Sequence, residues 1–174
     1  PKEVPIVTRL LAASGYQVGR TGKGWGPGSH AKLGIPSNSL GKVFLSEKLV
    51  DPPEGLNGTD YAANFDRFLE WRDSKKPFFF WAGVIEPHEP SGKENHLLLE
   101  KEFGVTLDQV SLPPFTKDTA GNRRKRARFV YEICCAYTHL ERMLKSLEAA
   151  GELDNTLVVV TSDNGTAILS EGQH

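Results

Sequence analysis

Residues 76–90 read KPFFFWAGVIEPHEP, and this stretch decides the fold class. Lys75-Lys76-Pro77 ends a helical pattern, because proline cannot continue a helix. The run Phe78–Val84 is continuously apolar, which is typical of a strand buried on both faces of a parallel sheet. A polar loop, Glu86-Pro87-His88-Glu89-Pro90, follows directly, and its two prolines restrict the backbone around His88.

The same order of helix, apolar strand and polar loop occurs three times. Before the quoted strand, Thr59 or Asp60 can cap a helix that carries Tyr61, Phe65, Phe68 and Leu69. Upstream, the stripe Ile6, Val7, Leu10, Leu11 and Ser14 predicts a helix that stops at Gly15, before a strand over 16–20 and a glycine-rich loop over 21–28. Downstream, a long helix with a stripe from Phe129 to Leu147 stops at Gly151, and 156–161 reads as a buried β-branched strand. Alternating helices and strands predict an α/β fold, a mostly parallel sheet with helices on both faces.

Two irregular excursions separate these units. Residues 30–58 are rich in Gly, Pro, Ser and Asn, and residues 91–117 contain a short helical pattern near 97–103. The adjacent Cys134 and Cys135 form neither a disulfide framework nor a zinc motif, and we expect small buried hydrophobic side chains there. With 174 residues, 39% of them hydrophobic, the chain suits one domain or part of a larger one. A net charge of −1 and the lack of a long apolar run give no indication of a nucleic-acid or membrane partner.

Polar side chains follow each predicted strand, where ligands bind in parallel sheets. Lys23 lies among glycines, and exposed backbone N–H groups with an ammonium suit a tetrahedral oxyanion, although a plain surface turn fits the pattern equally well. A dinucleotide loop is disfavoured because Pro27 and the polar run after it leave no helix start. His88 could bind an anion or donate a proton, or be structural. Asp163 and Asn164 offer the oxygens that calcium prefers, or a common Asp-Asn-Gly turn.

A basic run, Arg123, Arg124, Lys125, Arg126 and Arg128, begins the long helix. It could contact an acidic polymer, but we interpret it as the solvated face of a helix start.

Together the three loops resemble the sulfatase family of the alkaline-phosphatase-like superfamily. The matching segments are 10–16 leading into 21–28, 76–80 leading into 86–90, and 153–165, and their order is most similar to heparan N-sulfatase (sulfamidase)-like members. The resemblance covers the chain to about Gly165. It implies the N-terminal α/β domain of a sulfatase, of which we expect residues 1–174 to be an internal part. The nucleophile region and the C-terminal subdomain are then absent, and 166–174 is an atypical tail.

The resemblance also implies roles. Hydrolysis of a sulfate ester or sulfamate would use a calcium ion and a formylglycine nucleophile made from Cys or Ser. Lys23 would contact the sulfate, His88 the sulfate or the leaving group, and Asp163 and Asn164 the calcium. The substrate would be a sulfated saccharide or another small sulfate ester, and an extracytoplasmic location (periplasmic, secreted or lysosomal) is implied by resemblance alone.

The sequence departs from the family pattern in several places. No C/S-x-P/A-x-R motif occurs; Cys134-Cys135-Ala136 is the nearest string and lacks the arginine. The paired N-terminal aspartates that bind calcium are also missing. Trp25 stands where many sulfatases have a histidine, and we expect it to contact substrate. The tail lacks the lysine usual after Asp-Asn-Gly. We therefore expect this polypeptide alone to be inactive.

Two other functions fit the same residues. A phosphoesterase or phosphonate-cleaving enzyme of the superfamily would use zinc, but the Asp and His clusters it needs do not accompany His88 and His96. A non-catalytic binder of sulfated glycans would use the basic run instead.

Overall fold

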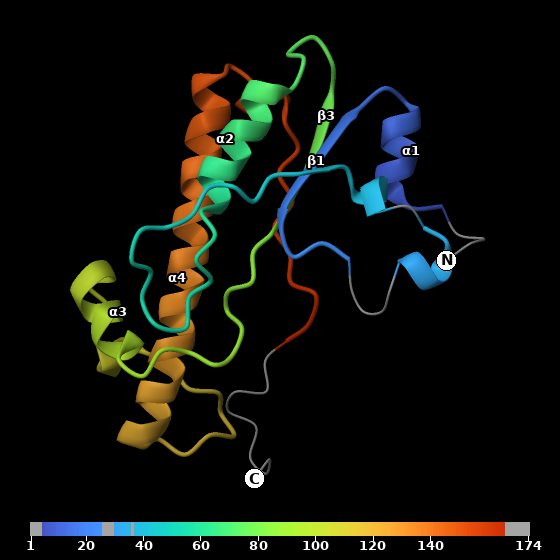
Figure 1. Cartoon of the computed structure of the whole chain (residues 1–174). Helices are drawn as coiled ribbons and strands as arrows, with labels where there is room; N and C mark the ends of the chain where they lie inside the picture. Colours follow the sequence, from blue (N-terminus) through green and yellow to red (C-terminus); the bar gives the residue numbers. More distant parts are fainter. Residues whose placement is uncertain (1–4, 26–29, 36, 166–174) are drawn as a thin grey trace. The chain divides into compact units, whose positions relative to one another are not determined.

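The computed structural model describes residues 5–25, 30–35 and 37–165, drawn in colour in Figure 1. Residues 26–28 of the glycine-rich loop and the tail 166–174 lie outside this range. The chain splits into two compact units. Unit 1 comprises Pro1–Val50 and Gly58–Ile85, and unit 2 comprises Asp51–Asn57 and Glu86–His174.

Unit 1 is built on a parallel sheet with the strand order β2-β1-β3. β1 (Gln17–Gly22) and β3 (Phe78–Gly83) are the two strands predicted for this region, and β2 (Lys42–Val43) lies in the stretch that was expected to be irregular. The ladder runs in register from Gln17 opposite Phe78 to Gly22 opposite Gly83. Both strands therefore end together at one edge of the sheet, as the sequence predicted for parallel strands.

Two α-helices accompany this sheet in the described part of unit 1. α1 (Val7–Ala13) ends before Gly15, whose φ of 91° is the left-handed conformation expected of a glycine stop. α1 packs beside β1, and the Thr8 hydroxyl donates a hydrogen bond to the Ser39 carbonyl. The helix was predicted correctly, but Val7 and Leu10 from its apolar stripe remain more than half exposed.

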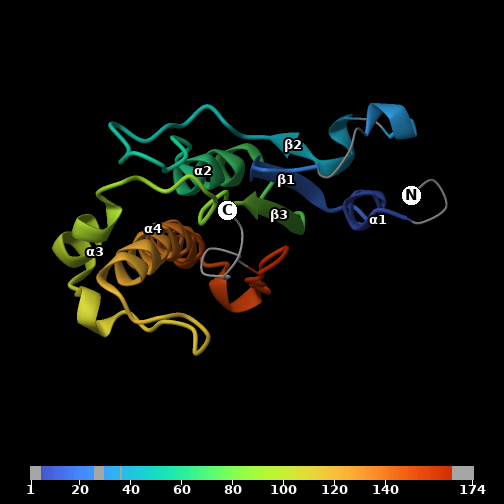
Figure 2. The same cartoon turned by 90° about the horizontal axis from the view of Figure 1, so that it is seen from below.

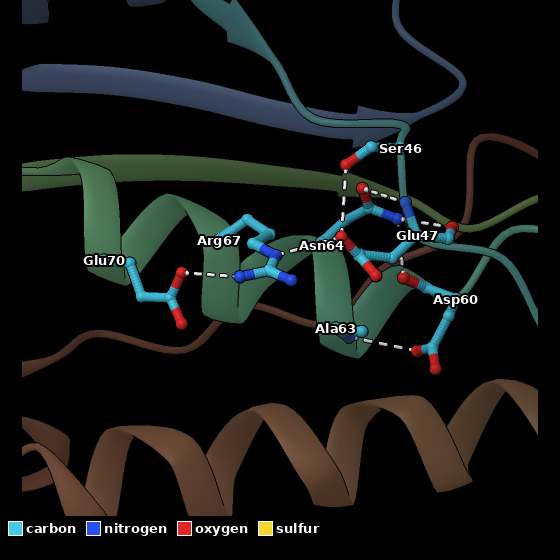
Figure 3. A network of polar contacts seen from close by, with 7 residues as sticks. All are labelled: Ser46, Glu47, Asp60, Ala63, Asn64, Arg67 and Glu70. Carbon is cyan, nitrogen blue, oxygen red and sulfur yellow. Dashed lines mark hydrogen bonds and ion pairs between the residues drawn. The ribbon is translucent and has the colours of Figure 1, made fainter.

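α2 (Tyr61–Trp71) is joined to the preceding loop by a polar network (Figure 3). The Asp60 carboxylate accepts a hydrogen bond from the Ala63 N–H at 3.0 Å, so the predicted cap is present. Asn64 is fully buried; its amide donates to the carbonyls of Glu47 (2.9 Å) and Asp60 (2.7 Å) and accepts from the Glu47 N–H (3.2 Å). Arg67 pairs with Glu47 at 2.9 Å. The Asn64 side chain thus connects the start of α2 to the loop that precedes it.

An aromatic layer joins α2 to one face of the sheet. The Phe68 ring lies 5.6 Å from that of Phe78 and 4.8 Å from that of Phe80. Gly19 of β1 leaves room for this packing, because a Cβ there would lie 2.4 Å from the Phe68 ring. Side chains alternate along a strand, and Trp81, on the other face, stays 47% exposed. α2 thus covers the face that carries Phe78 and Phe80, and within the described residues the expectation of a β3 strand buried on both faces is not met at Trp81.

Unit 2 contains the long helix α4 (Ala120–Ala149) and the shorter α3 (Asn95–Phe103), both predicted. Figure 2 shows α4 almost along its axis with α3 beside one end. The Thr119 hydroxyl caps α4 by accepting from the Asn122 N–H, and Gly151, with φ 68°, follows its end. The core consists of Leu99, Val110, Ala127 and Tyr131. Cys134 and Cys135 are free thiols that pack partly buried against it, in agreement with their predicted role.

Residues 156–161 do not form the predicted strand. They are assigned no strand, and Leu157, Val158, Val159 and Val160 are 89%, 40%, 73% and 61% exposed. β-branched composition favours a strand only where a neighbouring backbone completes the ladder and a second layer covers the side chains. In the described part of the chain this segment has neither. The α/β class with a parallel sheet holds, but β2 rather than this run supplies the third strand.

Candidate functional site

Lys23 comes directly after the last residue of β1. Its N–H donates to the Gly83 carbonyl at 2.7 Å, and its own carbonyl accepts from the Trp81 indole Nε1–H at 2.9 Å. Both backbone groups of Lys23 are thus held by β3, while the residue remains exposed. The backbone of Lys23 is therefore fixed at the edge where β1 and β3 end.

Two glycines make this arrangement sterically possible. Gly22 has φ 64°, a conformation that side chains disfavour, and a Cβ on it would lie 2.2 Å from the Gly83 carbonyl oxygen. A Cβ on Gly83 would lie 1.7 Å from the Lys23 carbonyl oxygen. The close approach of the two backbones is what places the Lys23 loop.

Arg20 lies against the same loop from β1. Its Nη1 donates to the Gly22 carbonyl at 3.3 Å, and a Cβ on Gly24 would lie 2.6 Å from that nitrogen. The guanidinium therefore packs on the residues immediately before and after Lys23. Arg20 is half-buried, and its Nε has no solvent exposure and no hydrogen-bond partner among the described residues.

Trp25 closes the described part of this loop. Its ring makes an edge contact with His30, with centroids 6.4 Å apart. Its indole Nε1 is buried and also has no acceptor among residues 5–25, 30–35 and 37–165. The expected role of Trp25 at the substrate stays a prediction, and the orphaned donor is compatible with it.

His88 lies in a loop of unit 2 in which both X-Pro bonds are cis. The Glu86 carboxylate accepts from the Asn57 N–H at 2.7 Å, which anchors the start of the loop. The His88 Nδ1 lies 2.7 Å from the Glu89 carbonyl oxygen. Because a carbonyl only accepts, a hydrogen bond to it requires the proton on Nδ1, and Nε2 of this exposed residue is then the ring nitrogen without a proton in the neutral imidazole. An imidazole in this tautomer can bind an anion when protonated and give that proton up at Nε2.

Glu132 of α4 is a titratable group near this loop that the sequence did not indicate. It is 1% exposed, and its Oε1 has no hydrogen-bond partner in the described structure. Burial raises the pKa of Glu132, and the charges of Glu86 and Glu89 act in the same direction. Hydrogen bonding from Ser91 and from the His88 backbone opposes this rise in pKa. The carboxyl thus lies under the His88 loop and can hold it through backbone contacts.

Asp163 and Asn164 are exposed, and the Ser162 hydroxyl donates to the Asn164 carbonyl at 2.6 Å. Their oxygens are of the kind calcium takes, but two residues cannot provide six to eight ligands. No group of three or more His, Cys, Asp or Glu side chains is placed to hold a metal within the described ranges. The described residues therefore do not form a complete calcium site on their own. They also do not follow a strand, contrary to the prediction for 156–161.

The predicted site residues fall in different units. Lys23 and Trp25 belong to unit 1, whereas His88, Asp163 and Asn164 belong to unit 2. The structure accounts for the local setting of each. That all of them surround one anion stays a prediction.

The basic run at the start of α4 has a structural explanation in part. Arg123 forms two 2.6 Å contacts with the Asp118 carboxylate and donates to the carbonyls of Leu107, Asp108 and Val110. Arg126 lies over the Phe129 ring at 5.0 Å. These contacts support the interpretation of the run as a helix start rather than as a binding surface.

Sequence reasoning missed four residues that hold the two loops: Arg20, Trp81, Gly83 and Glu132. Gly83 carried a usable signal, because a glycine directly after an aromatic strand often marks a close backbone approach. Arg20, Trp81 and Glu132 had none, since their roles depend on neighbours distant in the sequence.

Comparison with known proteins gives two matches. The family model described as Sulfatase matches residues 1–174. The endo-4-O-sulfatase of Bacteroides thetaiotaomicron is 30% identical over 104 residues, which is 58% of this chain and 20% of that protein. The matched region is thus about a fifth of the length of this curated relative. Within the described residues, no helix is both long and apolar enough to cross a membrane.

Proposed function

We propose, from the premise that this chain belongs to the sulfatase family, that it supplies the sulfate-binding part of a sulfuric ester hydrolase. The observation that carries the proposal is the anchoring of Lys23. Both of its backbone groups are held by β3 at the edge where two parallel strands end, and the residue is exposed. A fixed cation at that edge of an α/β sheet is suited to a small oxyanion.

His88 is the proposed partner of Lys23. In its neutral form Nδ1–H is engaged by the Glu89 carbonyl, so protonation occurs at Nε2. An imidazolium at that position binds a sulfuryl oxygen and can pass its proton to the departing oxygen of the ester, which otherwise leaves as an unstable alkoxide. Lys23 meanwhile stabilises negative charge on the sulfuryl oxygens.

We propose calcium as the metal and Asp163 and Asn164 as two of its ligands. Members of the family generally use a metal ion and a formylglycine. The 174 residues contain no C/S-x-P/A-x-R motif for that modification. We therefore expect the purified chain to leave a chromogenic aryl sulfate intact. Steady release of the phenol, proportional to enzyme concentration, would show that expectation to be wrong.

The proposed substrate is a sulfated saccharide. The endo-4-O-sulfatase match supports an O-sulfate, whereas the order of the three motifs supports a sulfamate-cleaving member of the heparan N-sulfatase type. An extracytoplasmic location is proposed from the family alone.

The sulfate site is tested by binding. Sodium sulfate is titrated into the ¹⁵N-labelled chain at constant ionic strength, with chloride as the reference, and affinity is taken from the amide shifts of residues 22–25. We expect Lys23→Met to weaken sulfate binding about 3- to 10-fold, as loss of a charge-assisted contact at an exposed position does. Lys75→Met, at another exposed lysine of unit 1, is the matched control.

The role of His88 is tested in the same titration. His96 is the natural control, because its Nδ1 also lies near a backbone carbonyl, that of Lys93 at 3.1 Å. We expect His88→Ala to weaken sulfate binding and His96→Ala to leave it unchanged. Equal affinities for all four variants and the unmodified chain would refute the proposed function.

A further inference from the structure

The β1 loop carries more anion-binding capacity than Lys23 alone accounts for. Residues 20–25 read RTGKGW, with two cations and no acidic residue. Among the described residues, the Arg20 side chain forms one hydrogen bond, at 3.3 Å to the Gly22 carbonyl, and no ion pair with a carboxylate. Within residues 5–25, 30–35 and 37–165, neither the buried Arg20 Nε nor the buried Trp25 Nε1 has a hydrogen-bond acceptor. A buried donor left unpaired costs about 1–3 kcal/mol, and more when it is charged.

The position of the guanidinium separates Arg20 from other arginines with an unpaired Nε. The Nε atoms of Arg72, Arg126 and Arg128 share that feature. Arg72 ends α2 and its guanidinium lies over the Phe78 ring, whereas Arg126 and Arg128 lie on the first turns of α4. The Arg20 guanidinium packs on Gly24 and bonds Gly22, so Lys23 stands between its two contact points. A planar group that donates from several nitrogens matches the two oxygens of a carboxylate or sulfate.

We propose that Arg20, with the Trp25 indole N–H as a second donor, binds an additional acidic group of the substrate beside the sulfate held by Lys23. This inference rests on the proposed function and specifies its substrate class: an ester carrying at least two negative groups close together. The second group is an oxyanion, either a carboxylate or another sulfate. Arg20 thereby becomes a residue that determines specificity, and Lys23 remains the one that binds the scissile group.

The indole and guanidinium N–H signals report on this site directly. The ¹⁵N-labelled chain has three tryptophans, at 25, 71 and 81. The indole N–H signal of Trp25 reports on the proposed donor. That of Trp81, which donates to the Lys23 carbonyl, reports on the conformation of the loop. Trp71, whose ring lies 4.3 Å from the Lys42 ammonium, is the internal control. Each indole is assigned from the corresponding Trp→Phe variant.

Three disaccharide probes distinguish the source of the second charge. The first carries one sulfate and one carboxylate, the second is its carboxyl-reduced form with one sulfate, and the third is the carboxyl-reduced form with two sulfates. We expect the first or the third to shift the Arg20 Nε–H and Trp25 indole signals and to bind about tenfold more tightly than the second. If only the first probe has these effects, Arg20 recognises a carboxylate. If only the third has them, Arg20 recognises a second sulfate.

Variants separate this inference from the function it rests on. Arg20→Gln should abolish the tenfold preference without changing affinity for inorganic sulfate, whereas Lys23→Met should weaken every probe. Arg20→Lys keeps the positive charge but loses the planar guanidinium with its several donors, so it should retain only part of the preference. An unmoved Trp81 signal shows that the loop stays folded in each variant. If Arg20→Gln disturbs that signal, the Arg20→Lys comparison decides.

Two results would overturn the proposal. One is that the unmodified chain binds all three disaccharides equally and that the Arg20 Nε–H and Trp25 indole signals do not shift. The other is an Arg20→Gln or Arg20→Lys variant that keeps the full preference. If Arg20→Gln abolishes sulfate binding and Lys23→Met has no effect on it, the proposed function itself is refuted.

Discussion

Replacing Gly83 by alanine should release the Lys23 loop from the sheet. The new Cβ would lie 1.7 Å from the Lys23 carbonyl oxygen, in a range below 3.0 Å that real Cβ atoms essentially never occupy. The obstructing atom is backbone, so no side-chain rotation relieves the contact. Lys23 must move away from β3.

The size of the effect follows from the bonds that are lost. Moving Lys23 breaks its N–H bond to the Gly83 carbonyl and the bond from the Trp81 indole to its own carbonyl. Two such bonds are together worth about 1–3 kcal/mol. The free energy of opening this loop should fall by that amount. Since 1.4 kcal/mol corresponds to a factor of ten, the equilibrium constant for opening should rise about 5- to 150-fold.

Native-state hydrogen exchange measures this change, because the Lys23 amide is protected by its bond to Gly83. We expect its exchange to accelerate about 5- to 150-fold in Gly83→Ala and the Trp81 indole signal to move. Gly121→Ala is the control: a Cβ there meets nothing closer than 3.9 Å, and α4 should be unchanged or slightly more stable. Unaltered Lys23 exchange in Gly83→Ala would refute the reasoning about loop placement.

Three further predictions concern stability and reactivity. Asn64→Ala removes three hydrogen bonds and leaves the Glu47 N–H without its acceptor, while the carbonyls of Glu47 and Asp60 keep their bonds from backbone N–H groups. The free energy of unfolding of unit 1 in urea should therefore fall by about 2–4 kcal/mol; a loss below about 0.5 kcal/mol would contradict the network. The pKa of Glu132 is raised above its ordinary 4.5 by burial, so its ionisation opposes folding: stability should decline as pH rises from about 4.5 through the higher folded pKa, and Glu132→Gln should remove that decline. Parallel stability curves for Glu132→Gln and the unmodified chain between pH 4 and 8 (roughly the range around a carboxyl pKa) would argue against it. Burial raises the pKa of the Cys135 thiol to about 11, so a disulfide reagent at pH 8 should label it far more slowly than a free cysteine peptide, at about 1% or less of the peptide rate once thiolate content and access are combined; labelling at the peptide rate would contradict a buried thiol.

The sequence was a good guide where local chemistry decides. The Asp60 cap and the glycine stops at Gly15 and Gly151 act within one or two turns of chain, and each was confirmed. The helix α4 was confirmed as well, but from its predicted stripe Tyr137 is 56% exposed. The aromatic run 78–83 was also placed correctly as a strand. Its burial was not, because burial depends on which face another element covers.

The site residues divide in the same way. Lys23 and His88 were selected as polar residues that follow a strand, and their roles stay predictions. The structure adds that β3 holds the Lys23 backbone and that the His88 Nδ1 lies 2.7 Å from the Glu89 carbonyl oxygen. The sequence did not indicate Arg20 and Glu132. Both stand out because a buried side-chain atom, the Arg20 Nε or the Glu132 Oε1, has no hydrogen-bond partner among the described residues, and burial is not visible in local sequence.

By itself, the sequence determined the α/β class, the identity of the helices and the residue types that suit sulfate chemistry. These follow from periodicity, capping and side-chain chemistry, which are properties of short stretches of chain. Only the tertiary structure decided that β2 joins the sheet while 156–161 does not, and that Gly83 and Trp81 hold Lys23 in place. A strand needs another backbone to pair with, and a loop is placed by atoms some 60 residues away (Trp81 and Lys23 are 58 apart), so neither outcome is written in local sequence.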